Sequence, residues 1–340
     1  MMKILSVIIP CYNSQDYMAR AIDSVIAGGE EVEVIVIDDG STDRTAEIAD
    51  DYAEKYPSIV KVIHKENGGH GSGINYGLKA ATGHFFKVVD SDDRVDEDAL
   101  LKVLDVLRKA IDNDMGLDML LTNYVYDKQG AKHKFVMKCK GIPKNRLISW
   151  DDVKKIRKYH YILMHSIIYR TDLLRLSGLE LPEHTYYVDN IYAFQPLPYV
   201  KKFCYKDIDL YWYYIGREGQ SVSEEKLIKQ IDQYIRVTRI MTSVYSDSKF
   251  VTDSKACLNY MLNYLEIVFA ITCNFLNLSK DPESIAKKKK LWNDVNDIDD
   301  EAASRLRKRL VLVLTNLPGA PGRMISKYGY RAISKLLGLN

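Results

Sequence analysis

The chain of 340 residues suits one large α/β domain with an appendage, or two domains. Hydrophobic residues make up 46% of it and charged residues 28%, which argues against a disordered, collagen-like or disulfide-scaffold protein. The 48 Lys and Arg residues nearly balance the 46 Asp and Glu residues, and a net charge of +2 argues against a dedicated nucleic-acid binder.

The cysteines and the N-terminus bear on the compartment. Five cysteines show no C-x-x-C or Cys/His metal spacing, which argues against a disulfide framework or a zinc site and favours a reducing compartment. The apolar run before Pro10 is too short for a secretory signal, and no stretch approaches the roughly 18 to 20 apolar residues that span a bilayer. We expect a cytoplasmic protein, free or peripheral on the inner face of the cell membrane.

The N-terminal part of the chain alternates between short apolar runs and helical spacing. Strands are expected at 5–9, 32–37, 59–63 and 85–89, and helices at 16–27, 74–81 and 96–107, with another between Ser41 and Pro57. This alternation predicts a parallel sheet covered by helices, in which ligands bind at the carboxyl ends of the strands.

Beyond residue 118 the pattern becomes mixed. Strands are expected at 119–126 and 134–137 as antiparallel additions to the sheet, and the sequence is helical from Glu224 onward. We predict an α/β domain over 1–223, a helical region over 224–300 and a basic tail over 301–340.

The acidic segment Asp90-Ser91-Asp92-Asp93 directly follows the fourth expected strand. Residues two apart in an extended chain point the same way, so Asp90 and Asp92 are expected to address one site. Unpaired carboxylates are costly to bury, and Mg²⁺ or Mn²⁺ takes carboxylate oxygens together with substrate phosphates. The alternative is a helix-capping turn before the helix at 96–107.

Two other strand ends carry polar or turn-forming residues. Asp38 and Asp39 follow the second strand and are suited to hold a base or ribose by hydrogen bonds, with a helix cap and Gly turn as the alternative. The glycine-rich stretch 66–73 precedes a helix, which would let its backbone approach a ligand or phosphate, with a flexible loop as the alternative. It has no P-loop ending.

Four motifs occur in one order along the chain: Val7-Ile8-Ile9-Pro10-Cys11-Tyr12-Asn13, Val36-Ile37-Asp38-Asp39-Gly40-Ser41-Thr42-Asp43, Asn67-Gly68-Gly69 and Val89-Asp90-Ser91-Asp92-Asp93. Together, and at these separations, they resemble glycosyltransferase family 2. The resemblance covers about residues 1–222. It implies a GT-A fold, which is a Rossmann-like mixed sheet flanked by helices, a nucleotide-diphospho-sugar donor, and inversion at the anomeric carbon.

The resemblance also implies which residues bind the nucleobase. Pro10 and Tyr12 would line the base pocket, where Tyr12 is able to stack on uracil. Asp39 and Asn67 would bind the base.

The diphosphate and its cation are assigned in the same way. Asp90 would contact the ribose or the metal side, next to Ser91 in the donor site, and Asp92 would ligate the Mn²⁺ or Mg²⁺ that bridges the diphosphate. Arg217 and Ser221, on a loop that resembles the one closing over the donor, would meet the diphosphate. A plain surface loop is the alternative.

One departure from the family concerns an arginine near the donor. Many members have Ala-Arg-Asn where this chain has Ser72-Gly73-Ile74-Asn75, so the arginine is missing. His70 and Lys87 are the candidates that would compensate, and the sequence does not decide between them.

The resemblance predicts a catalytic base about a hundred residues past the metal motif. Asp189 in Tyr186-Tyr187-Val188-Asp189-Asn190 fits, with Val188 in place of the usual Glu. It would take the proton of the acceptor hydroxyl while the metal stabilises the departing diphosphate. A helix cap for 191–197 is the alternative.

Two observations refine this assignment. His165 is expected on a strand before Asp189, either helping the donor or cation or packed as a core histidine. The Gln-x-x-Arg-Trp element of processive polysaccharide synthases is absent, so one sugar per encounter is expected.

The C-terminal part offers less specific signals. Residues 302–340 contain no acids, and their basic and apolar side chains recur at helical spacing, which suits a membrane surface; a helix packed on the catalytic domain is the alternative. The region 224–300 is expected to be an acceptor platform or a homodimer interface. The basic residues of the tail are Arg305, Arg307, Lys308, Arg309, Arg323, Lys327, Arg331 and Lys335.

The sequence thus predicts a metal-dependent inverting glycosyltransferase. It would move a single sugar from a UDP-sugar to a saccharide or lipid-linked acceptor in cell-surface polysaccharide synthesis. The rivals are a nucleotidyltransferase or NAD-dependent enzyme on a similar fold, and a catalytically silent scaffold.

Overall fold

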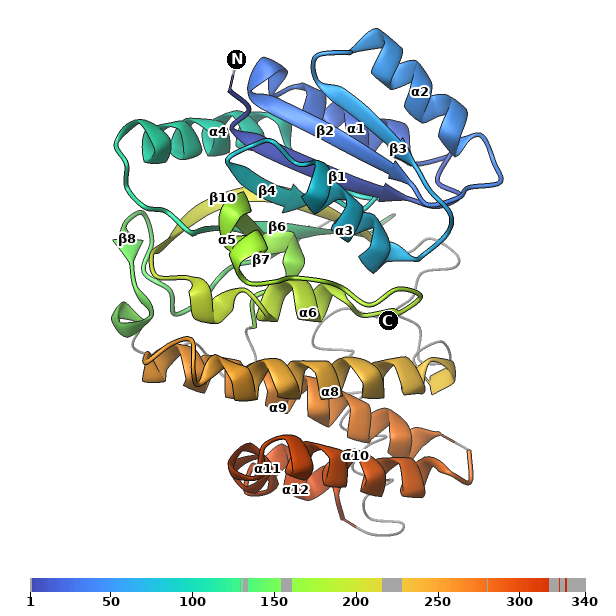
Figure 1. Ribbon diagram of the computed structural model, residues 1–340, viewed down its shortest axis with the longest axis vertical. Coiled ribbons are helices and arrows are strands. Elements are labelled where there is room, and N and C mark those ends of the chain that lie inside the picture. The colour runs from blue at the N-terminus through green and yellow to red at the C-terminus, as the bar shows by residue number, and fades with distance from the viewer. Residues whose placement is uncertain are drawn as a thin grey trace. The chain divides into compact units, whose positions relative to one another are not determined.

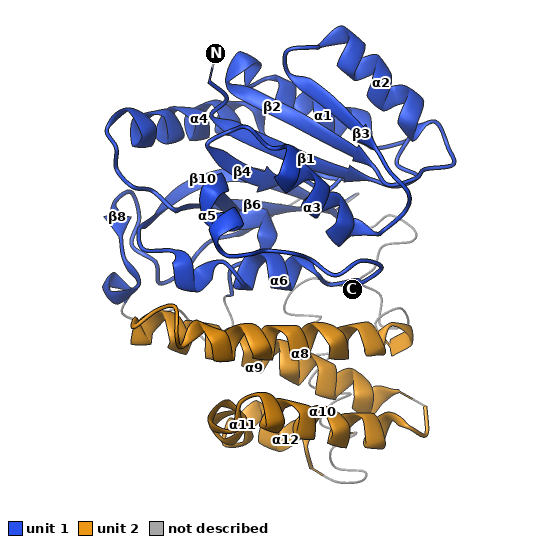
Figure 2. Ribbon diagram, viewed as in Figure 1, with its two compact units in different colours: residues 1–219 blue, residues 220–340 orange. Residues whose placement is uncertain are grey.

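The computed structural model describes residues 2–128, 130, 134–153, 161–215, 228–279, 281–317, 324 and 328. The chain divides into two compact units, residues 1–219 (unit 1) and residues 220–340 (unit 2), which Figure 2 colours separately.

Unit 1 is built on a mixed sheet with the strand order β3-β2-β1-β4-β9-β6-β10-β5, in which β7 pairs with β6 and β8 with β10 (Figure 1). Strands β1 to β4 run parallel, whereas β9 is antiparallel to both β4 and β6, and β10 is parallel to β6. The strands are β1 Leu5–Cys11, β2 Val32–Asp38, β3 Val60–His64, β4 Phe85–Val88, β5 Arg94–Val95, β6 Met119–Lys128, β7 Phe135–Met137, β8 Leu147–Ile148, β9 Ile167–Arg170 and β10 Phe203–Ile215.

Helices cover both faces of this sheet. The apolar sides of α1 and α4 join the alternate residues of β1 and β2 in one core, while α3 packs on Ile8 and α6 on Phe86 from the other face. The helices of unit 1 are α1 Met18–Ile26, α2 Thr45–Lys55, α3 His70–Ala80, α4 Glu97–Asp112, α5 Thr171–Leu176 and α6 Asp189–Phe194, with 3-10 turns η1 Gly29–Glu31, η2 Trp150–Asp152, η3 Met164–Ser166 and η4 Leu197–Tyr199.

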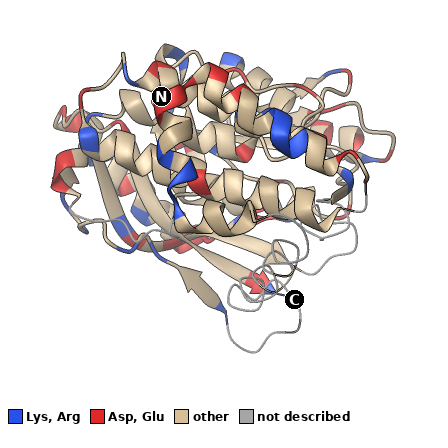
Figure 3. Cartoon of the chain, turned by 90° about the horizontal axis from the view of Figure 1, so that it is seen from below, with Lys and Arg blue, Asp and Glu red and all other residues tan. Residues whose placement is uncertain are grey.

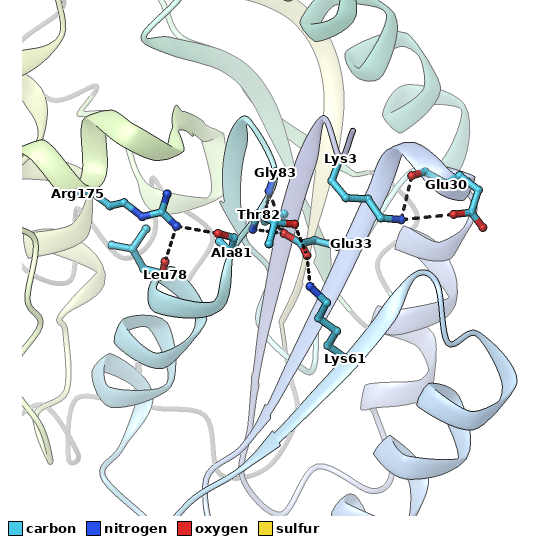
Figure 4. A network of polar contacts seen from close by, with 10 residues as sticks. Lys3, Glu30, Glu33, Lys61, Leu78, Ala81, Thr82, Gly83 and Arg175 are labelled. Atoms are coloured by element: carbon cyan, nitrogen blue, oxygen red, sulfur yellow. Dashed lines mark hydrogen bonds and ion pairs between the residues drawn. The ribbon is translucent and has the colours of Figure 1, made fainter. Parts of the chain in front are cut away.

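A buried carboxylate ties the amino-terminal edge of the sheet together (Figure 4). Glu33 accepts hydrogen bonds from the Ser6 hydroxyl at 2.5 Å, from the Thr82 N–H at 2.5 Å and hydroxyl at 2.9 Å, and from the Gly83 N–H at 2.9 Å. It also pairs with Lys61 at 2.9 Å. Burial by itself would raise the pKa of Glu33, but these donors outweigh it and hold the pKa below its usual value. The network links β1, β2, β3 and the turn before β4.

Unit 2 is helical in its described residues. Its helices are α8 Ile231–Ser248, α9 Lys255–Leu278, α10 Ser284–Ile298, α11 Asp300–Arg307 and α12 Leu310–Thr315. Acidic and basic residues occur together across the view in Figure 3, in keeping with the small net charge.

Helix α9 is long and apolar enough to cross a membrane by length and composition. The prediction that no stretch approaches this length was therefore wrong. However, 61% of its most apolar window is buried within the structure, and a mostly buried core helix meets the same criterion. The composition of α9 alone is therefore weak support for a membrane span.

The structure corrects two further sequence predictions. Helix α3 begins at His70 instead of Ile74, so Gly71 and Gly73 lie inside its first turns and not in a loop. The segment around His165 is a 3-10 turn that leads into β9, not a strand. The strands expected at 5–9, 32–37, 119–126 and 134–137 are present.

Candidate active site

The acidic segment after β4 is a turn. The Asp93 N–H donates to the Asp90 carbonyl at 3.0 Å, so the chain reverses over Asp90–Asp93 before β5 begins. The extended geometry that was expected to align Asp90 with Asp92 is therefore wrong. The reversal brings Asp93, which sequence reasoning left out of the site, beside Asp90 and His165, with ligand atoms within 4.8 Å of one another.

Asp93 anchors this acid turn (Asp90–Asp93) to strand β10. Its Oδ2 accepts the Tyr211 hydroxyl at 2.5 Å, and its Oδ1 accepts the Tyr214 N–H at 2.8 Å. Burial, together with the Asp92 and Asp90 carboxylates, raises the pKa of Asp93 well above its usual value. Both oxygens of Asp93 are thus bonded to β10, and Asp92, the predicted cation ligand, lies outside the group of Asp90, Asp93 and His165 whose ligand atoms converge.

His70 joins the turn to the predicted base. Its Nε2 lies 2.8 Å from Oδ1 of Asp90. Burial by itself would lower the pKa of His70, but the charges of Asp90, Asp189 and Asp92 outweigh it and raise the pKa. Asp189 therefore belongs to the same electrostatic cluster as the acid turn, although almost a hundred residues separate them in sequence.

Asp189 is half-buried next to these charged groups. Burial raises its pKa to about 6; His70 opposes this rise and Asp90 adds to it. Asp189 is the first residue of α6 and not the residue before the helix, so the alternative of a capping position is not what the structure shows.

Helix α3 positions the segment that carries Asp189. Asn75 exchanges two hydrogen bonds with the backbone of Leu181, at 2.8 and 2.9 Å, and the Ser72 hydroxyl donates to Glu183 at 2.7 Å. A Cβ on Gly71 would lie 2.9 Å from the Pro182 carbonyl, so only glycine permits this contact. The stretch that replaces the family's Ala-Arg-Asn thus holds the base segment in place.

Two candidates were named for the missing arginine. The His70 side chain already pairs with Asp90 through its Nε2. Lys87 is 0% exposed, and its ammonium donates to the His165 carbonyl at 2.9 Å beneath the acid turn. Burial lowers the pKa of Lys87 to about 7, and Asp90 opposes the fall. Its burial argues against direct contact with a donor.

His165 sits in a cage of tyrosines. Its ring stacks on Tyr211 at 4.7 Å between centroids, with Tyr124 edge-on at 5.4 Å. Burial lowers the pKa of His165 to about 4, so the imidazole is neutral near pH 7. Its Nδ1 is buried with no hydrogen-bond partner among the described residues. His165 is thus a packed histidine that keeps a free nitrogen next to Asp90 and Asp93.

The predicted base-binding residues gather at the ends of β1, β2 and β3. The Asp39 carboxylate accepts the N–H groups of Gly68 and Gly69 at 2.9 and 2.7 Å and pairs with Lys65 at 2.6 Å. The Asn67 amide donates to the Asp39 carbonyl at 2.9 Å. Asp39 and Asn67 therefore lie together, and Asp39 shapes the glycine turn. Lys65 was missed because no motif includes it.

The remaining predicted donor residues lie close by. Ser91 of the acid turn is 2.8 Å from the Ser14 hydroxyl, which connects the turn to the end of β1. Tyr12 is 53% exposed, which leaves its ring accessible for stacking, and Pro10 is buried in β1. Arg217 and Ser221 lie outside the described residues.

Residues 6–141 match the family model for glycosyl transferase family 2. The uncharacterized glycosyltransferase YibD of Escherichia coli is 27% identical over 251 residues, covering 70% of this chain and 70% of YibD. The minor teichoic acid biosynthesis protein GgaB of Bacillus subtilis is 41% identical over 102 residues, covering 29% of this chain and 11% of GgaB. The poly(ribitol-phosphate) beta-glucosyltransferase of Bacillus spizizenii is 28% identical over 226 residues, covering 64% of this chain and 33% of that protein. The last two alignments span less than two thirds of those relatives.

Solved structures share the fold. TarS 1–349 of S. aureus, in complex with UDP-GlcNAc, aligns with a TM-score of 0.66 at 23% identity, over 97% of this chain and 92% of that one. The mannosyltransferase PcManGT of Pyrobaculum calidifontis aligns with a TM-score of 0.52 at 15% identity, over 99% of this chain and 87% of that one. The expected GT-A-like mixed sheet with a helical C-terminal region is confirmed. The match over residues 6–141, the relatives named as glycosyltransferases and the shared fold bear out the resemblance to glycosyltransferase family 2.

Proposed function

We propose that this glycosyltransferase is metal-dependent and inverting, and that it moves one sugar from a UDP-sugar to a saccharide or lipid-linked acceptor in cell-surface polysaccharide synthesis. The observation that carries the proposal is the cluster of Asp90, Asp92, His70 and Asp189, which joins a strand-end acid turn to a carboxylate from a distant segment.

A divalent cation fits the acid turn. Asp90 and Asp92 offer the carboxylate oxygens that Mg²⁺ and Mn²⁺ prefer, while both oxygens of Asp93 bond to β10. When bound, such an ion would stabilise the negative charge of the departing diphosphate. A cationic side chain also lies at the turn, where the Arg20 guanidinium donates to the Asp92 carbonyl at 3.1 Å.

Asp189 would be the general base. A carboxylate takes the proton of an attacking hydroxyl most effectively when its pKa lies near the working pH, and burial raises the pKa of Asp189 to about 6. By pairing with Asp90, His70 would hold the acid turn in a fixed position relative to the base.

The choice of donor rests on the base-binding end of the sheet and on the relatives. Tyr12 offers an exposed ring for a base, next to the glycine turn that Asp39 and Asn67 hold in shape. TarS was solved with UDP-GlcNAc, and GgaB and the beta-glucosyltransferase bear the names of teichoic acid or poly(ribitol-phosphate) enzymes. A UDP-sugar and a cell-surface polymer are therefore the proposed donor and setting. The homodimer and the peripheral membrane location stay predictions.

Two variants test the proposal by separate readouts. Asp92→Asn is expected to weaken UDP binding in the presence of Mn²⁺, measured by calorimetry, whereas Asp189→Asn is expected to spare it. With a UDP-sugar and its acceptor, Asp189→Asn should lower kcat by about 10²- to 10⁴-fold. Asp172→Asn, an exposed aspartate on α5, is the matched control. Absence of UDP binding by the unmodified protein, or full turnover by Asp189→Asn, would contradict the proposal.

A further inference from the structure

Aromatic side chains form a row across neighbouring strands of unit 1. Strand β7 pairs with β6 so that Phe135 lies opposite Tyr126, and β10 pairs with β6 so that Tyr213 is level with Tyr126. Paired positions on adjacent strands place their side chains on the same face of a sheet. Phe135, Tyr126 and Tyr213 (the aromatic row) therefore lie side by side.

The rings of the aromatic row contact one another and remain accessible. The centroids of Tyr126 and Phe135 are 6.4 Å apart with nearly parallel planes at 26°, and those of Tyr126 and Tyr213 are 5.8 Å apart. Phe135 is 57% exposed, and Tyr126 and Tyr213 are half-buried. The planes of Tyr126 and Tyr213 are tilted by 47°, so the row is a stepped surface, and its linked rings lose little side-chain entropy when a ligand covers them.

The aromatic row borders the acid turn. The Tyr213 ring packs on His165 at 4.7 Å, and burial, together with the carboxylates of the acid turn, raises the pKa of Tyr213. The ligand atoms of His165, Asp90 and Asp93 lie within 4.8 Å of one another. A ligand on the row would thus lie beside the acid turn.

The strand order separates the aromatic row from the donor residues. The predicted base-binding residues follow β1, β2 and β3, on one side of β4, whereas the row belongs to β6, β7 and β10, on the other side of β4 and β9. The acid turn at the end of β4 lies between these two groups in the sheet. A nucleobase bound at the ends of β1 to β3 therefore leaves the aromatic row uncovered.

We propose that the aromatic row binds a pyranose ring of the acceptor, an inference that rests on the proposed glycosyl transfer. One face of a pyranose presents C–H groups that carry slight positive charge, which matches the negative face of an aromatic ring. Stacking on the row holds the sugar by this apolar face and leaves its hydroxyl groups at the ring's edge free to face Asp189. The row is therefore an acceptor subsite for a saccharide, and not a subsite for the nucleotide.

Ligand-observed NMR tests this inference with simple probes. Saturation-transfer difference spectra are recorded for the methyl β-glycosides of glucose, galactose and N-acetylglucosamine, with the full chain, UDP and the diamagnetic Mg²⁺. Transfer is expected to be strongest at the C–H protons of one ring face. Phe135→Ala should weaken binding of the responding glycoside about 2- to 12-fold, and Phe135→Trp should preserve it. Phe250→Ala removes a phenylalanine that is 90% exposed in unit 2 and is the control.

UDP titration of the same samples separates the two proposals. Two results overturn the saccharide subsite and leave the proposed function standing. In one, UDP binds but no glycoside shows a saturation-transfer signal; in the other, the signal is equal in Phe135→Ala and the unmodified protein. Failure of UDP to bind contradicts the proposed function itself. Because Phe135 is exposed, circular dichroism and UDP binding should be unchanged in Phe135→Ala, which excludes misfolding as the cause of a loss.

Discussion

At the scale of single residues, the catalytic proposal depends on the charge of Asp189. A general base works only when deprotonated, so a pKa of about 6 predicts that activity is lost as the pH falls below this value and is retained above it. The pH profile of kcat/KM, measured at saturating Mn²⁺, should show one acidic limb near pH 6. In Asp189→Glu the midpoint of this acidic limb should shift to another pH. An unchanged midpoint in that variant would mean that another group titrates.

The resemblance to family motifs predicted part of this cluster. Asp90, Asp92 and Asp189 were found because they match family motifs. Asp93 was present in the same motif, but its role depends on Tyr211 and Tyr214, which lie on β10 more than a hundred residues away. A hydrogen bond between such distant positions leaves no local pattern in one sequence, so no spacing rule would have identified it.

At the scale of elements, α3 acts on the base segment through Asn75. Removing its side chain in Asn75→Ala leaves the buried Leu181 backbone without both hydrogen-bond partners, which costs about 1 to 3 kcal/mol of local stability. We expect kcat to fall while the affinity for UDP stays within about 2-fold, since α3 would release Asp189 and not the donor residues. Lys79→Ala, an exposed change on the same helix, is the control. Equal losses in kcat and UDP affinity would contradict this division.

The start of α3 also shows why the glycine-rich stretch was predicted as a loop. Glycine is unfavourable in helices, so Gly71 and Gly73 argued for a helix beginning at Ile74. In the structure a Cβ on Gly73 would lie 3.1 Å from Pro10, and Gly71 has no room beside Pro182. Tertiary packing on both sides therefore overrides the local propensity, and the sequence gives no sign of it.

Glu33 makes the sheet sensitive to acid. Folding lowers its pKa, so its stabilisation is present above the carboxyl's unfolded pKa and is lost as the pH falls through the folded pKa. Glu33→Gln replaces one acceptor oxygen by an amide donor, and a destabilisation of about 1 to 3 kcal/mol is expected at pH 7. Urea unfolding between pH 3 and 7 should show a smaller loss of stability on acidification in Glu33→Gln than in the unmodified chain. The exposed Glu54→Gln should behave like the unmodified chain.

At the scale of the whole molecule, unit 1 was the more predictable part. Its first strands are recognisable in the sequence as short apolar runs that end at motif residues, such as Ile9-Pro10 and Val89-Asp90. The strand expected around His165 begins only at Ile167, and its antiparallel place between β4 and β6 was not predicted, because the Ile167–Arg170 segment is too short to give a periodic signal. Unit 2 has no motif, and its helical spacing predicted helices without predicting a role.

The surface of unit 2 tests the predicted membrane association. Leu310, Val313 and Leu317 are 67%, 43% and 37% exposed along and just after α12, and Lys308 is exposed beside them. Exposed apolar groups next to cations suit an anionic lipid surface, where each cation contributes about 1 kcal/mol. The full chain is therefore expected to sediment with phosphatidylglycerol vesicles and less with phosphatidylcholine vesicles.

A truncation that tests the tail must leave the buried residues of unit 2 in place. Removing residues from 302 onward would delete the buried Ala303, Leu306 and Leu312, and a loss of binding would then report unfolding. Ending the chain after Leu317 keeps α11 and α12 and removes four basic residues of the tail. This truncation and Leu310→Ser should each reduce sedimentation with anionic vesicles, whereas Phe250→Ser should not. Equal recovery of all four proteins in the supernatant would show that neither α12 nor the tail binds lipid.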